Sequence, residues 1–317
     1  MSSQFKILSL DGGGVRGYLT TRILENVEQY LNQANNENIN IGQRFDLIAG
    51  TSTGAIIGGL LSIGKSAKEV REFYEEYIKD IFGQKNNWFK WFKPKYDNSF
   101  LEMKLKEFFG EKTLADVQTD ILITSVALST AKPRFYKSGY LDRNSSRLDE
   151  KLSDVILAST SAPTYFKAKE KMKHSSFLID GGIVANNPSL VALIDALQFE
   201  STSLNHTQKP KSFDEITLLS IGTGEICCVP YDYSKLQNAG LINWAKPISD
   251  IVLEAQSQLA SFQTGFLMKP NNYLRINPKL KVKIELDDIK QINELKNLAD
   301  LEKTHEQFLI NNFIGEQ

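Results

Sequence analysis

The chain has few of the residues that staple a fold, anchor it in a membrane or export it. Its only two cysteines are the neighbours Cys227-Cys228, which cannot close an ordinary disulfide across the fold and lack the spacing of metal ligands. No apolar run reaches the length of a membrane-spanning helix, and residues 1–10 run into Asp11 too soon to form a signal peptide. We therefore expect a soluble, cytoplasmic protein, with export by a route without a classical signal as the alternative.

Charge of one sign is also scarce. The 37 basic and 38 acidic residues leave a formal net charge of −1. A protein that binds nucleic acid in general needs a basic field to neutralise phosphates, so this balance argues against nucleic acid as a partner. Any partner attracted by charge must be met by a local patch.

Apolar segments of strand length alternate with segments of helical periodicity along most of the chain. Strands are expected at 5–10, 45–49, 120–127, 134–136, 177–179, 215–221 and, as a late edge strand, 273–276. Helices are expected at 17–31, 66–82, 98–109, 153–159, after Pro188 and at 288–313. The pattern predicts a three-layer α/β/α sandwich around a mostly parallel sheet. We expect one domain over 1–317, with a core at about 5–225 and a mostly helical part, 233–317, packed on it.

The strand at 45–49 leads into Gly50-Thr51-Ser52-Thr53-Gly54 and then into a helix. This is the pattern of a nucleophile elbow, in which a serine on a tight strand-to-helix turn projects from the end of the sheet. Glycines flank the serine because a Cβ would clash there. The alternative is a glycine-rich turn whose serine only caps the helix.

A second glycine loop, Gly12-Gly13-Gly14-Val15-Arg16-Gly17, follows the first strand. Its G-x-G-x-x-G spacing also fits a dinucleotide-binding loop, which would suggest an oxidoreductase. That function needs an acidic residue at the end of the next strand, which instead ends at Ala49-Gly50. Neighbouring parallel strands place this loop beside Ser52, where its N–H groups could face the oxyanion formed during ester attack.

A serine nucleophile needs a base, and the chain has only three histidines, His174, His206 and His305. A triad of Ser52, Asp180 and His305 would have the chain order of α/β-hydrolases, but His305 lies on a polar helix face. Asp180 ends an apolar strand and is followed by two glycines. It is therefore the candidate base, and an ordinary Asp-Gly turn is the alternative.

The motifs Asp11-Gly-Gly-Gly-Val-Arg-Gly17, Gly50-Thr-Ser-Thr-Gly54 and Asp180-Gly-Gly182, in this order, resemble those of the patatin-like phospholipases. The segments at 158–166, 184–188, 219–224 and 273–276 are similar to those of its plant-patatin-like branch. This likeness spans most of the chain.

The resemblance implies a lipid acyl hydrolase with a Ser–Asp dyad, which acts through an acyl-serine intermediate and needs no metal, calcium or cofactor. Ser52 would be the nucleophile and Asp180 the general base. The oxyanion hole would comprise Gly12, Gly13 and Gly14. Supporting motif residues would be Arg16, Gly17, Gly50, Gly54, Gly181 and Gly182. Arg16 would brace the glycine loop or lie near anionic head groups. The alternative within this fold is a catalytically idle lipid-binding or storage protein.

The substrates implied are membrane phospholipids or galactolipids, and some bacterial relatives are switched on by a protein or a small messenger. The aromatic residues Trp88, Phe89, Trp91 and Phe92 alternate with lysines and are the candidate membrane contact. The alternative is that they cap an edge of the core. With them we expect transient association with a membrane.

Overall fold

The computed structural model describes residues 4–82, 94–138, 148–174, 176–198, 209–226, 233–238 and 240–314. The aromatic residues Trp88, Phe89, Trp91 and Phe92, and the pair Cys227-Cys228, lie outside the described residues. The strands are β1 Phe5–Leu10, β2 Leu47–Gly50, β3 Asp120–Ala127, β4 Lys132–Lys137, β5 Lys169–Lys171, β6 Ser176–Asp180, β7 Ile216–Ile221, β8 Glu225–Ile226, β9 Tyr273–Ile276 and β10 Lys279–Leu280. The helices are α1 Gly17–Asn35, α2 Thr53–Ser62, α3 Ala67–Phe82, α4 Asn98–Phe109, α5 Leu152–Ser159, α6 Gly182–Ala185, α7 Ser189–Ala196, α8 Tyr233–Leu236, α9 Leu241–Leu267, α10 Ile292–Lys296 and α11 Lys303–Phe313.

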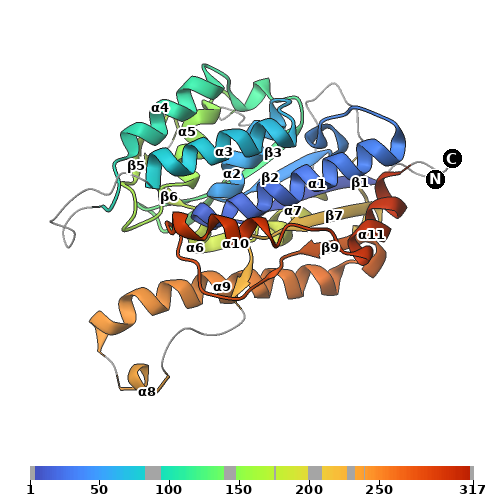
Figure 1. Cartoon of the computed structure of the whole chain (residues 1–317). Coiled ribbons are helices and arrows are strands. Elements are labelled where there is room, and N and C mark those ends of the chain that lie inside the picture. Colours follow the sequence, from blue (N-terminus) through green and yellow to red (C-terminus); the bar gives the residue numbers. More distant parts are fainter. Residues whose placement is uncertain are drawn as a thin grey trace.

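The main sheet has the strand order β5-β6-β3-β2-β1-β7-β9, and β4 also pairs with β3 (Figure 1). The five strands from β3 to β9 are parallel, whereas β4, β5 and β6 join antiparallel. Leu10, the last residue of β1, pairs with Gly50 of β2 and Ile221 of β7. Three strands therefore end level at one edge of the sheet. This confirms the mostly parallel sheet and the edge position of 273–276.

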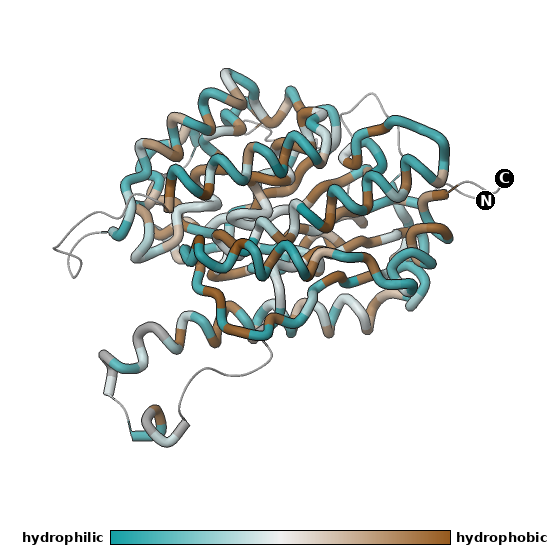
Figure 2. Tube along the Cα trace, in the orientation of Figure 1, coloured by the Kyte–Doolittle hydropathy of each residue, from teal (hydrophilic) through white to brown (hydrophobic). Residues whose placement is uncertain are grey.

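Helices cover both faces of the sheet. Leu8, Leu10 and Ile48 belong to a large core that includes residues of α1 to α5, α10 and α11. Their strand neighbours Ile7 and Leu47 face the other way, into a smaller core with residues of α7 and with Met268. This alternation is the period of two expected for strands buried on both sides. The three-layer α/β/α sandwich is confirmed, and Figure 2 shows hydrophobic and hydrophilic residues alternating along the helices that cover the sheet.

The helix expected at 288–313 is wrong in its continuity, because α10 ends at Lys296 and α11 begins at Lys303. Between them the carbonyl of Ala299 accepts a hydrogen bond from Asn26 Nδ2 at 2.9 Å. The new helix then starts with a capping contact, in which the N–H of Glu302 donates to Nδ1 of His305 at 3.1 Å. Side chains thus form hydrogen bonds with backbone C=O and N–H groups that would form backbone hydrogen bonds in a continuous helix.

Within the part of the chain that the structure describes, no helix is both long enough and apolar enough to cross a bilayer.

Candidate active site

Strand pairing explains why Ser52 and Asp180 meet. One edge of β3 is occupied by β4 along 122–127. The other edge pairs first with β2, where Gly50 lies opposite Ile123, and then with β6, where Asp180 lies opposite Ser125. Because β2 runs parallel and β6 antiparallel to β3, their last residues point toward each other along one edge. The elbow after β2 therefore faces the carboxylate at the end of β6.

The elbow has the predicted strand–turn–helix form. Ser52 precedes α2 with φ of 53° and ψ of −118°, a left-handed φ that is uncommon outside glycine. A Cβ on Gly54 would lie 2.1 Å from the carbonyl oxygen of Leu10, and one on Gly50 would lie 2.4 Å from that of Gly54. Both flanking glycines are thus required by close backbone contacts, and the serine is held in a strained turn.

Ser52 Oγ donates a hydrogen bond to Oδ2 of Asp180 at 2.6 Å. The other carboxylate oxygen, Oδ1, accepts the N–H of Gly182 at 2.6 Å. Asp180 is only 6% exposed. Short bonds of this kind are typical of a hydroxyl or N–H donating to an ionised carboxylate. The two predicted catalytic residues are therefore in direct contact, and Gly182 orients the carboxylate.

Burial raises the pKa of Asp180 to about 6, while the hydrogen bonds from Ser52 and Gly182 oppose this rise. At pH 7 the carboxylate is thus mostly ionised. It is also a stronger base than a carboxylate in water, because removing the surrounding water disfavours its charge. The environment of Asp180 therefore suits proton removal from Ser52.

The glycine loop lies against the serine, since a Cβ on Gly12 would be 3.3 Å from the Cβ of Ser52. The N–H of Gly12 donates to the carbonyl of Asn186 at 3.0 Å, so it is not free for a substrate. The N–H groups of Gly13 and Gly14 donate to no other residue in the described ranges. Of the three predicted oxyanion donors, only Gly13 and Gly14 thus have an available N–H.

Tight contacts also surround the other motif glycines. A Cβ on Gly17 would lie 1.9 Å from Cγ2 of Thr53, and one on Gly181 would lie 2.0 Å from Oγ1 of Thr124. Arg16 Nε points at the carbonyl of Gly13 at 3.5 Å, inside the fold. This contact favours the loop-bracing role for Arg16 over a contact with head groups.

Ser159, at the end of α5, contacts both Ser52 and Gly181, and the sequence did not predict these contacts. Its hydroxyl accepts the N–H of Ser52 at 2.8 Å, and its carbonyl accepts the N–H of Gly181 at 3.4 Å. Two residues later, the carbonyl of Ser161 accepts the N–H of Asp180 at 3.0 Å. One segment therefore holds both the nucleophile turn and the base. The sequence signal was the run of small residues at 158–161, which gave no role to any one of them.

Asp11 has a structural partner that was also missed. Its carboxylate forms a two-pronged ion pair with Arg275 of β9, and Oδ1 accepts from Nη1 at 2.8 Å. Ser257 of α9 donates to Oδ2 of Asp11 at 3.3 Å. Asp11, the first residue of the glycine motif, thus links β1 to β9 and α9 next to the glycine loop.

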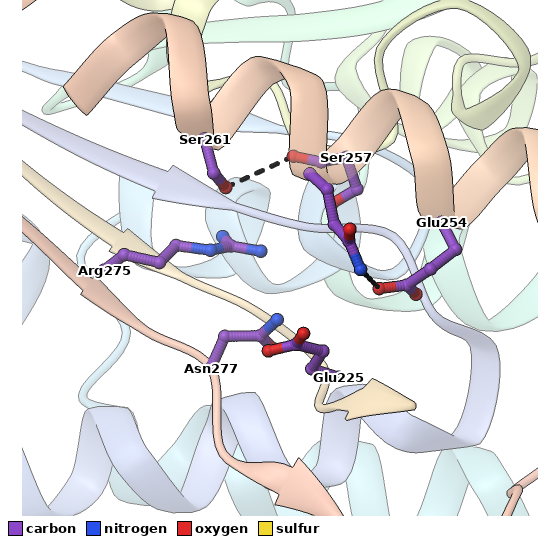
Figure 3. Close-up of a pocket in the computed structure, with 7 residues that line it drawn as sticks. Glu225, Glu254, Ser257, Ser261, Arg275 and Asn277 are labelled. Atoms are coloured by element: carbon purple, nitrogen blue, oxygen red, sulfur yellow. Dashed lines mark hydrogen bonds between the residues drawn. The ribbon is translucent and has the colours of Figure 1, made fainter. Parts of the chain in front are cut away.

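Beside this ion pair lies a polar pocket of about 400 Å³ between α9, the start of β8 and the end of β9. Figure 3 shows Arg275 and Asn277 coming from the strand side and Ser257 and Ser261 from α9. The lining residues are Glu225, Glu254, Ser257, Gln258, Ser261, Arg275 and Asn277. Neither Ser52 nor Asp180 lines this pocket, so it neighbours the dyad without containing it.

The described histidines are engaged elsewhere. His174 Nε2 contacts Asp149 at 2.9 Å at the surface, and His305 caps α11. His206 lies outside the described residues. The carboxylate of Asp180 is already bonded through both of its oxygens. The geometry therefore brings together the predicted nucleophile and base, with no histidine from the described chain.

The comparisons with a family model and with known proteins agree with one another. A family model described as "Patatin-like phospholipase" matches residues 8–193. Patatin-like protein 4 of Arabidopsis thaliana is 34% identical over 93% of this chain and 82% of its own length. Patatin-like protein 1 of the same plant is 31% identical over 96% of this chain and 81% of its own length. A cGAMP-activated phospholipase of Escherichia coli (strain TW11681) is 35% identical over 72% of this chain and 63% of its own length.

Proposed function

The chain belongs to the patatin-like phospholipase family, and we propose that it hydrolyses fatty-acyl esters of membrane lipids with Ser52 as nucleophile and Asp180 as base. The observation that carries this proposal is the hydrogen bond of 2.6 Å from Ser52 Oγ to a buried carboxylate. A serine that only caps a helix would donate to or accept from its own first turn, and Ser52 has no such side-chain bond. The strained φ of Ser52 is a second support, because strain of this kind clusters at active sites.

In the first step Asp180 Oδ2 takes the hydroxyl proton as Ser52 Oγ attacks the ester carbonyl carbon. The carbonyl oxygen becomes an oxyanion, and the N–H groups of Gly13 and Gly14 are the donors that would stabilise it. The C–O bond to the glycerol oxygen then breaks, and the leaving alcohol takes the proton back from Asp180. The products of this step are the lyso-lipid and an acyl ester on Ser52.

In the second step a water molecule attacks the acyl carbon while Asp180 takes its proton. The fatty acid leaves when the bond to Ser52 Oγ breaks, and Asp180 returns the proton to Ser52. Gly182 holds Oδ1 throughout by its N–H, so Oδ2 stays directed at the reacting atoms. None of these steps uses a metal ion, so we propose that the reaction is independent of calcium.

The test is release of free fatty acid from mixed phospholipid and galactolipid vesicles in the presence of EDTA. We expect wild-type activity, and losses of about 10³-fold or more for Ser52→Ala and Asp180→Asn. An Asp180→Asn enzyme with near-normal activity, or a requirement for calcium, would contradict the dyad. Activity on neither vesicles nor a soluble ester would favour the idle lipid-binding protein.

An activator is a further expectation, supported by the likeness to the Escherichia coli protein named as cGAMP-activated. The same assay is therefore repeated with cGAMP added. A stimulation of the wild type but not of Ser52→Ala is the expected result. Equal rates with and without cGAMP would contradict this expectation and would show that the enzyme does not need this activator.

A further inference from the structure

The long helix α9 carries an exposed apolar face. Its members recur every three or four residues and so form one stripe along the helix: Ile248, Ile251, Val252, Ala255, Leu259, Phe262 and Phe266. Phe262 is 72% exposed and Phe266 is 83% exposed. Figure 1 shows α9 at the outside of the molecule, with the sheet on one side of it. Exposed apolar side chains that line up in this way mark an interaction surface.

The opposite face of α9 is polar and is used by the catalytic region. Gln256 accepts the N–H of Asn186 at 3.1 Å and donates to the carbonyl of Gly182. Ser257 bonds to Asp11. Thr264 is buried against Ser189, with 3.2 Å between their hydroxyl oxygens. An ordinary surface helix turns its apolar face inward, so this arrangement is reversed, and the outward apolar stripe is not explained by the core.

The stripe also carries no charge. The acidic residues of this part of α9, Asp250 and Glu254, are partly buried, and Asp250 pairs with Lys283 at 2.7 Å. The residues that flank the stripe on the exposed side are Ser249, Gln258 and Gln263. A helix that pairs with another protein helix usually has charged residues at these flanking positions, which set register and partner. Here they are neutral.

Exposed apolar residues are also present on the two helices next to α9. Ile183 and Val184 lie on α6, directly after the Asp180-Gly181-Gly182 motif, and Ile194 lies on α7. Both helices pack against α9. Exposed apolar residues thus occur on three neighbouring helices, and α6 directly follows the base Asp180 and Gly181 in the chain. A single helical seam for a second copy of the chain would not need α6 and α7.

We propose that the outer face of α9 docks on a lipid surface, with Phe262 and Phe266 inserted among the acyl chains. This inference rests on the proposed function, because it describes how the same enzyme reaches its substrate. Since the stripe is uncharged, the interaction is hydrophobic and requires neither anionic lipid nor low salt. The inner face of α9 then transmits the docked position to Gly182 and Asp11, which frame the active site.

The experiment measures binding to phosphatidylcholine vesicles by sedimentation, in a Ser52→Ala background so that no lipid is consumed. The stripe variant is Phe262→Gln/Phe266→Gln, and Ile248→Gln/Val252→Gln is a second one. The matched control is Met103→Gln/Ile310→Gln, which changes exposed apolar residues on α4 and α11. We expect each stripe variant to bind more than about tenfold more weakly, the control to bind normally, and all binding to be insensitive to salt.

Equal binding by the stripe variants and the control would overturn the proposal. It would also be overturned if Phe262→Gln/Phe266→Gln converted a dimer into a monomer and left vesicle binding unchanged, since the stripe would then cover a second copy. Hydrolysis of a soluble short-chain ester separates this proposal from the proposed function. The stripe variants with intact Ser52 should keep this activity, whereas a failure of the wild type on the same ester would contradict the chemistry and not the docking.

Discussion

The two sides of α9 differ in opposite ways from an ordinary surface helix, because polar groups are buried on one side and apolar groups are exposed on the other. The inner side faces the dyad, where the carboxylates of Asp180 and Asp11 are buried and accept hydrogen bonds. The outer side faces away from the fold, where phenylalanines such as Phe262 are mostly exposed. Burying a carboxylate costs free energy, and a row of large exposed apolar side chains is uncommon on the surface of a monomer. These two features support the two proposals made above, proton transfer on one side of the helix and contact with a lipid surface on the other.

A change of pH should distinguish the two sides of α9, because Asp180 lies on the inner side and the outer stripe has no titratable group. The pKa of Asp180 is raised to about 6, and only its ionised form can accept the proton of Ser52. We expect kcat/KM on a soluble ester to be flat above pH 7 and to fall about tenfold per unit well below pH 6, hence about a hundredfold by pH 4. Vesicle binding through the uncharged stripe should not follow this curve. A profile with its midpoint near 4 would show that Asp180 is not held as the structure places it.

Removing the buried charge should stabilise the protein. Asp180 has a pKa of about 6 when folded, against 3.8 as its ordinary value, so the folded state binds its proton more tightly. Its ionisation therefore costs stability above pH 6, at most about 3 kcal/mol, and costs nothing below about pH 4, where both states are protonated. Because Asn also weakens the hydrogen bonds from Ser52 and Gly182, we expect Asp180→Asn to gain about 1–2 kcal/mol at pH 8.

Denaturant unfolding of wild type and Asp180→Asn at pH 8 and pH 4 measures this difference. The gain should vanish at the lower pH. Destabilisation at pH 8 would mean that the carboxylate contributes more through its hydrogen bonds than its burial costs, and a gain of equal size at both values would separate the effect from ionisation.

The inner side was largely predictable from the sequence, because its motifs are local. Ser52 lies in a five-residue elbow, and Asp180 is recognised by the two glycines that follow it. Ser159 and the partner of Asp11 were not predictable, since α5 and Arg275 reach the loop only through the folded sheet. Nothing in a run of small residues or in a single arginine indicates which backbone groups it will meet.

The outer side was missed for a different reason. A stripe of apolar residues at helical spacing is normally the face that enters the core, so periodicity alone places Phe262 and Phe266 inside. The membrane contact was instead predicted at Trp88, Phe89, Trp91 and Phe92, which lie outside the described residues and stay a prediction. The two candidates differ in charge. Binding through the lysine-rich aromatic segment should need anionic lipid and low salt, whereas binding through α9 should need neither.

The smallest expected effect concerns the stability of the stripe variants. Phe262 and Phe266 are mostly exposed and contribute little to the core, so Phe262→Gln/Phe266→Gln should change the free energy of unfolding by no more than about 0.5 kcal/mol. Denaturant unfolding without lipid checks this, with Met103→Gln/Ile310→Gln as the matched pair. A loss of several kcal/mol would show that the two rings pack against the protein in solution. The apolar stripe would then be part of the fold, and the contrast between the two sides of α9 would disappear.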